Sequence, residues 1–94
     1  MEIRFYKDPQ TDLPHIYEHG VTEDEVNEIL LGRGEDLPAK QASHMKLGQT
    51  RAGRYLQIIY VPDEEPGSVF VITAYELQTK AKAAFRRRQR RKSR

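Results

Sequence analysis

Cysteine and tryptophan are both absent from the 94 residues of this chain. Without cysteine, disulfide bonds and thiolate metal ligands are excluded. No apolar run approaches the ~20 residues that a membrane-spanning helix needs. The first ten residues, MEIRFYKDPQ, are charged and lack the apolar segment of a secretory signal. These absences predict a single cytoplasmic domain without a membrane partner.

Charges of the two signs are unevenly distributed along the chain. Lys and Arg number 16 and Asp and Glu 14, for a formal net charge of +2. Nine of the basic residues and none of the acidic ones lie in residues 80–94, which leaves seven against fourteen, or −7, in residues 1–79. We therefore expect a single domain over residues 1–79 and a basic C-terminal helix or tail over residues 80–94.

An arginine-rich segment of this kind has two interpretations. It can neutralise phosphates and bind nucleic acid in a salt-dependent manner, or it can be a solvated tail that folds back on its own acidic domain. The sequence leaves both open. The residues predicted to contact nucleic acid are Arg51, Arg86, Arg87, Arg88, Arg90, Arg91 and Lys92.

The stretch HIYEH (15–19) has the H-x-x-E-H spacing of one class of zinc metallopeptidase. On a helix, His15 and His19 lie one turn apart with Glu18 beside them. A catalytic zinc usually needs three protein ligands and a bound water, whereas Pro14 and Gly20 limit this helix to barely two turns. We therefore predict no metal and no other cofactor.

The segment that follows carries the clearest helix start. Thr22 and Glu25 form a capping box, in which the hydroxyl and the carboxylate each satisfy a backbone N–H group. Val21 and Val26 match a hydrophobic staple around that cap. Glycines at positions 32 and 34 end the helix.

Three strands are expected in the second half of the chain. Segments 44–50 and 54–61 flank the loop RAG (51–53), in which Gly53 can supply a positive φ. Residues 54–61 are apolar on both faces, which predicts a central strand. Residues 69–77 form another strand rich in β-branched residues.

The remaining elements complete the predicted order. A short strand covers residues 2–6, and the last helix docks through Phe85 and frays into the arginines. The order is then β-α-α-β-β-β-α. It predicts an α+β domain with an antiparallel sheet, two N-terminal helices on one side and a basic C-terminal helix.

Three motifs in order support a family resemblance: HGVTEDEVNEIL, LGQTRAGRYLQIIYV and VFVITAYEL. They resemble a family of small domains of unknown function allied with the BrnT-type toxins of the RelE superfamily, over about residues 13–78. Its members have a histidine shortly before the capped helix, a Gly and an Arg near the start of a strand, and a closing I-T-x-Y-E strand. The resemblance implies a RelE/BrnT-like fold, metal-independent RNA cleavage and neutralisation by an antitoxin. It carries His15, Arg54, Tyr75 and Glu76 over as motif positions.

Acid–base chemistry is the most economical use of these side chains. RNA cleavage through the 2′-hydroxyl needs a base, an acid for the leaving 5′-oxygen and a cation for the phosphorane. Histidine can perform either proton transfer near neutral pH, and an arginine can contact the phosphate. The candidate catalytic residues are His15, Glu18, His19, Arg54, Tyr75 and Glu76.

Each candidate also has a purely structural interpretation. His15 can pack the short helix, Tyr75 can belong to the sheet core, and Arg54 can pair with Glu76 or Asp63. The other tyrosines are interpreted as packing residues and not as platforms for base stacking. The alternative to a ribonuclease is thus a non-catalytic module that binds RNA or a protein partner through its arginine-rich segment.

Overall fold

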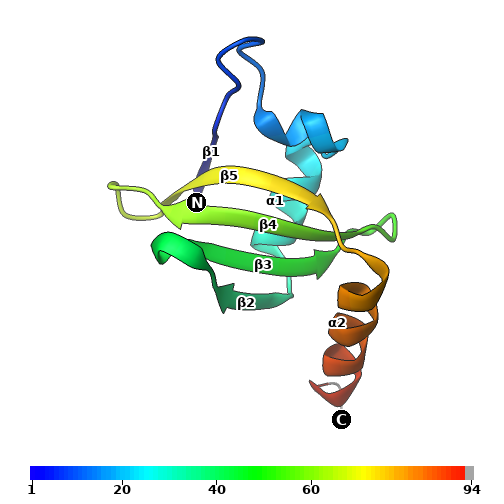
Figure 1. Ribbon diagram of the computed structural model, residues 1–94. Coiled ribbons are helices and arrows are strands. Elements are labelled where there is room, and N and C mark those ends of the chain that lie inside the picture. The colour runs from blue at the N-terminus through cyan, green and yellow to red at the C-terminus, as the bar shows by residue number, and fades with distance from the viewer. Residues whose placement is uncertain (93–94) are drawn as a thin grey trace.

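The computed structural model describes residues 1–92; Ser93 and Arg94, the end of the predicted 80–94 segment, lie outside the described residues. The fold is α+β, with a five-stranded mixed sheet (Figure 1). The elements in chain order are β1 (Glu2–Phe5), η1 (His15–His19), α1 (Glu23–Leu31), β2 (Glu35–Pro38), η2 (Lys40–Ala42), β3 (His44–Gln49), β4 (Tyr55–Pro62), β5 (Ser68–Glu76) and α2 (Thr79–Lys92). No helix in the part of the chain that the structure describes is long and apolar enough to cross a membrane.

β4 is the central strand of the sheet, whose order is β1-β5-β4-β3-β2. It pairs antiparallel with β3 on one side and with β5 on the other, with an irregularity between Ile59 and Tyr60. The connection from β3 to β4 turns at Gly53, where φ is +99° and the N–H donates to the carbonyl of Thr50. The predicted central strand and its glycine-containing hairpin are both confirmed.

The predicted antiparallel sheet is wrong at one edge and lacks a strand at the other. β1 pairs in parallel with β5, with Glu2 opposite Ser68, so the sheet is mixed. β2 was not predicted, and it pairs antiparallel with β3. Its sequence EDLP is short, polar and ends in proline, so it becomes a strand only because β3 offers an edge to pair with.

The prediction of two N-terminal helices is also wrong, because HIYEH forms a single 3-10 turn, η1. The Tyr17 N–H donates to the carbonyl of Pro14 and the Gly20 N–H to that of Tyr17, both at the i→i+3 spacing. Gly20 ends the turn in the left-handed region at φ +69°. Five residues between Pro14 and Gly20 leave too little length for an α-helix. Only α1 precedes the sheet hairpin as an α-helix in the described chain.

α1 covers one face of the sheet and supplies the larger core. Its predicted capping box between Thr22 and Glu25 is present, which confirms the start of this helix. Nine buried residues form this core, at one face of β4 and β5: Ile16, Val21, Val26, Ile29, Leu30, Leu56, Ile58, Val71 and Ala74. Gly48 of β3 lets α1 approach, since a Cβ there would lie 3.0 Å from the Ile29 side chain.

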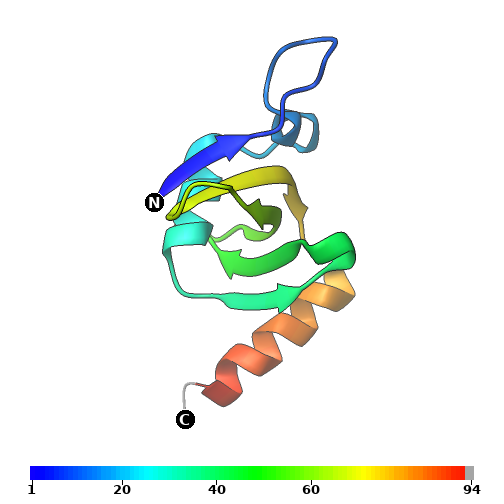
Figure 2. The same ribbon diagram turned by 90° about the vertical axis from the view of Figure 1, so that its left-hand side faces the viewer.

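α2 leaves the end of β5 and runs past the edge formed by β3 and β2 (Figure 2). Phe85 is buried against Leu47 and Leu77, which confirms the predicted docking residue. The expected fraying is wrong within the described chain, because the helix continues through the arginines to Lys92. An ion pair between Arg88 and Glu35 of β2, at 2.6 Å, helps to hold this part of the helix against the sheet.

Candidate functional site

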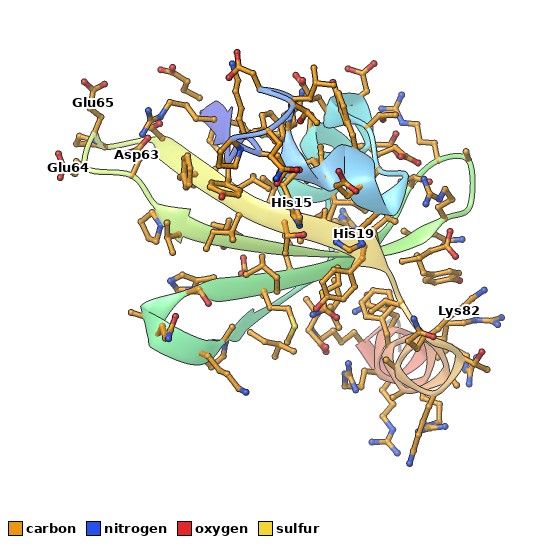
Figure 3. The ribbon with its side chains drawn as sticks, turned by 45° about the horizontal axis from the view of Figure 1, so that its top comes forward. His15, His19, Asp63, Glu64, Glu65 and Lys82 are labelled. Atoms are coloured by element: carbon orange, nitrogen blue, oxygen red, sulfur yellow. The ribbon has the colours of Figure 1, made fainter. Side chains whose placement is uncertain are left out.

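Four aromatic rings form a row that we call the histidine row: Tyr6, His15, His19 and Tyr75. The centroids of the two imidazoles are 5.3 Å apart, and that of His19 is 5.7 Å from the Tyr75 ring; both contacts are edge-to-face. η1 places the two histidines beside β5, toward the same end of the sheet as Lys82 and away from the acidic turn at Asp63 (Figure 3). The structure thus brings together three of the six predicted catalytic residues.

The His15 imidazole is held by Asp8, a residue that the sequence did not single out. Their Nδ1 and Oδ1 atoms are 2.9 Å apart, and His15 is half-buried. An ionised carboxylate accepts hydrogen bonds only, so in the neutral imidazole paired with it the Nδ1 atom carries the proton and Nε2 is left as the acceptor. A seven-residue separation across a loop carries no periodic signal, which is why this pair was missed.

Tyr75 lies on the face of the sheet opposite α1. Its hydroxyl accepts a hydrogen bond from Nε2 of Gln57, at 2.9 Å, on the neighbouring strand. The Tyr75 hydroxyl proton therefore remains available to a further acceptor. Glu18, the acidic residue of the HIYEH stretch and a further predicted catalytic residue, is exposed.

Arg54 and Glu76, the other two predicted catalytic residues, lie on the α1 side. Nη1 of Arg54 donates to both carboxylate oxygens of Glu25 at 2.8 Å and to the Gly20 carbonyl at 3.0 Å. Its Nε donates to Glu76 at 3.0 Å, the structural pairing that the sequence offered as an alternative. Arg54 therefore ties together α1, β5 and the glycine that ends η1.

This network sets the ionisation of its members. Burial opposes the charge on Glu25, but hydrogen bonds from the Thr22 N–H and from Arg54 outweigh it and lower the pKa of the Glu25 carboxyl. Burial likewise opposes the charge on Arg54, while its two carboxylate partners raise the pKa of the guanidinium. A phosphate at Arg54 would have to compete with two carboxylates that the protein already supplies.

The residues of α2 that were predicted to contact nucleic acid have different surroundings in the structure. Arg88 is engaged by Glu35, which raises the pKa of its guanidinium through their hydrogen bond. Arg86 and Arg90 line a groove between the helix and the sheet. The exposed residues Arg87, Arg91 and Lys92 complete the helix.

Arg51 lies apart from this helix, in the turn between β3 and β4. Its main-chain N–H donates to the carboxylate of Glu28 on α1. Its other neighbours around a shallow hollow include Asp24 and Asn27. This acidic surrounding distinguishes it from the arginines of α2.

Among residues 1–92, no group of three or more His, Asp or Glu side chains is placed to hold a metal ion. Comparisons of the chain with protein-family models, curated proteins and solved structures found no match.

Proposed function

We propose that this protein binds RNA and cleaves its backbone without a metal ion, with His15 and His19 as the acid–base pair. The observation that carries the proposal is their geometry: two imidazoles 5.3 Å apart, one of them oriented by Asp8. That separation allows both rings to reach one phosphodiester. A carboxylate behind a histidine is the usual way to present its other nitrogen to a substrate.

In the proposed reaction the phosphoryl group is transferred within the RNA, from the 5′-oxygen to the neighbouring 2′-oxygen. Nε2 of His15 removes the proton of the RNA 2′-hydroxyl, and the 2′-oxygen attacks phosphorus. The bond from phosphorus to the 5′-oxygen breaks, and protonated His19 donates a proton to that oxygen. The products are a 2′,3′-cyclic phosphate and a 5′-hydroxyl, and the proton gained by His15 returns through solvent to His19.

Tyr75 and α2 complete the proposal. The Tyr75 hydroxyl accepts from Gln57 and its ring contacts His19. This supports a role for the hydroxyl as a donor to a phosphate oxygen. The arginines of α2 supply the positive charge that the backbone of RNA requires. Arg54 acts as a positioning residue, because it holds the Gly20 carbonyl directly after His19.

The kinship with BrnT-type toxins of the RelE superfamily remains part of this proposal. The motif residues quoted from the sequence support it. It adds the expectation of an antitoxin protein that binds this chain and blocks the histidine row. Co-purification of a second small protein encoded beside this one, with loss of RNA cleavage, would test that expectation.

The test is incubation of the purified full chain with RNA in EDTA, with products separated by size and their ends identified. We expect cleavage that leaves 2′,3′-cyclic phosphates and stops when the 2′-hydroxyls are replaced by hydrogen. His15→Gln and His19→Gln should each lower the rate by about 100-fold or more, the usual value of an acid or base. Tyr75→Phe should have a smaller effect.

His44→Gln is the matched control, since it removes the third histidine, which stacks on Tyr60 and takes no part in the histidine row. It should leave the rate unchanged, and thermal unfolding should show that all variants fold. Intact RNA after incubation with the wild-type protein would refute the catalytic proposal. If the three histidine variants lower the cleavage rate equally, the histidine row has no special role in catalysis.

A second candidate function, binding of RNA without cleavage, is favoured by the finding that the arginine-rich segment is a formed helix docked on the sheet. The helix is anchored by Phe85 and by the Arg88–Glu35 ion pair, independently of the histidine row. This second function predicts salt-dependent RNA binding that survives His15→Gln but is lost when residues 86–94 are removed.

A further inference from the structure

A groove separates α2 from the β3–β4 hairpin, and we call it the nucleotide groove. Its volume is about 290 Å³, near the lower end of the range of small-molecule sites. The residues that line it are Gln49, Tyr55, Phe85, Arg86, Gln89 and Arg90. The lining therefore combines two aromatic rings, two amides and two guanidiniums at the α2 side of the sheet.

Tyr55 is the central ring of this groove. It is half-buried, and its ring meets that of Phe85 edge-on with the centroids 6.1 Å apart. That contact fixes the ring without burying all of it. Nζ of Lys82 lies 4.9 Å from the centroid of Tyr55, and the guanidinium carbon of Arg86 lies 6.0 Å from it. The ring is thus a π surface that already attracts cations.

Three cations of α2 on the side of this ring follow the helix period. Lys82, Arg86 and Arg90 are spaced by four residues, so they form one row along α2, which we call the basic row. Arg86 and Arg90 of this row line the groove. The rotation of the helix that turns them to it is set by Phe85 and Arg88. Arg87 and Arg91 are exposed, as are Arg86 and Arg90, but they do not line the groove.

We propose that the nucleotide groove binds one unpaired nucleotide, whose base takes the place of Lys82 and Arg86 on the Tyr55 ring. The displaced cations then hold its phosphates together with Arg90. The inference rests on the proposed function in that it takes RNA as the ligand, and it adds that the bound RNA is single-stranded. Bases inside a duplex have no free face for the Tyr55 ring, whereas unpaired bases stack on aromatic side chains. The amide of Gln49, which is exposed, has both a donor and an acceptor to offer to a base edge.

A purely electrostatic phosphate site is the competing explanation. It requires the basic residues but neither the ring nor the amides. It also predicts that all exposed arginines of α2 contribute equally to binding. The two explanations therefore differ in the role of Tyr55 and in the ranking of the two rows of arginines.

The experiment measures binding of labelled single-stranded oligouridine of about six nucleotides to the full chain by fluorescence anisotropy. The oligouridine carries 2′-O-methyl groups, so binding is measured without cleavage. The same measurement uses a 2′-O-methyl duplex and inorganic polyphosphate as competitors. The variants are Tyr55→Leu, with Tyr55→Phe as its control, and the double variants Arg86→Gln/Arg90→Gln and Arg87→Gln/Arg91→Gln. The double variants change charge equally at exposed helix positions, so they report on the groove even if Tyr55→Leu folds poorly.

We expect Tyr55→Leu to weaken single-strand binding about 10-fold, since each stacked base contributes to that extent. Tyr55→Phe should bind like the wild type, and polyphosphate should bind Tyr55→Leu as it binds the wild type. Arg86→Gln/Arg90→Gln should weaken binding at least about five times more than Arg87→Gln/Arg91→Gln does.

The inference is overturned if the oligouridine does not bind, or if polyphosphate or the duplex displaces it as well as unlabelled single strand does. It is also overturned if the two double variants weaken binding equally. If the protein cleaves RNA and Tyr55→Leu binds the single strand as tightly as the wild type, the nucleotide groove is refuted and the catalytic proposal stands. Tyr55-dependent binding without cleavage would refute the catalytic proposal alone.

Discussion

The two faces of the sheet differ in how they are held and in what they carry. The α1 face has a core of nine buried residues contributed by η1, α1, β4 and β5 and by Val21 between η1 and α1. The α2 face has a buried cluster of only three, namely Leu47, Leu77 and Phe85, supplemented by the Arg88–Glu35 ion pair. Because burial of apolar area dominates folding free energy, the α1 face carries most of the stability. The α2 face is left free to present Tyr55, Gln57 and Tyr75.

Adjacent isoleucines in β4 test this comparison most directly. Ile58 is fully buried on the α1 face, whereas Ile59 is half-buried on the other face. We expect Ile58→Ala to lower the free energy of unfolding by about 3–4 kcal/mol, because it removes buried methyl groups and leaves a cavity. Ile59→Ala should cost about 1 kcal/mol, since fewer contacts are lost. Urea denaturation followed by circular dichroism measures both, and equal losses would mean that the faces are equally packed.

Phe85→Ala should produce a smaller and more local effect. Removal of this ring loosens α2 from Leu47 and Leu77 while leaving the α1 core in place. We expect the loss in global stability to stay below the about 3–5 kcal/mol that is usual for a Phe→Ala change in a packed core. The reason is that a helix docked by few contacts can detach without unfolding the sheet. Hydrogen exchange should show faster exchange in α2 amides and unchanged exchange in β4.

Arg87→Ala serves as the control for that experiment, since Arg87 lies on α2 and is exposed. It should leave exchange unchanged throughout the chain. A uniform loss of protection in Phe85→Ala, including β4, would show that α2 and the α1 core unfold as one unit.

The smallest expected effect concerns the pH dependence of the α1 face. The pKa of Glu25 is lowered: burial acts against the charge, but hydrogen bonds from Thr22 and Arg54 outweigh it. Its charged form therefore stabilises the fold above pH ~4.5, and this stabilisation is lost as the pH falls through the lowered pKa. Glu25→Gln should cost about 1 kcal/mol at neutral pH and less in acid.

Asp24→Asn is the matched control, because Asp24 is an exposed acid in the same first turn. It should not change the slope of stability against pH below pH ~4.5 as Glu25→Gln does. Thermal unfolding across the acid range measures this slope. Parallel curves for wild type and Glu25→Gln would show that the carboxylate does not drive the acid dependence.

Sequence reasoning found the features whose causes lie within a few residues of one another. The Thr22–Glu25 capping box, the Gly53 turn and the docking of Phe85 each follow from local spacing and residue type. It placed His15, His19 and Tyr75 among the site candidates because their chemistry suits proton transfer. It missed Asp8, whose pairing with His15 depends on the path of a loop.

The sequence by itself determined the capped α1 helix, the two-faced apolar strand β4 and the basic composition of the C-terminal helix, since each is encoded by short-range pattern. Only the tertiary structure decided the parallel pairing of β1, the strand β2 and the division of the arginines between Glu35, the nucleotide groove and solvent. Arg54 belongs to the same group, because its partners Gly20, Glu25 and Glu76 are brought together from distant segments. The physical reason is that hydrogen-bond and charge partners far apart in the chain are selected by the packing of the whole domain, and local periodicity carries no record of that choice.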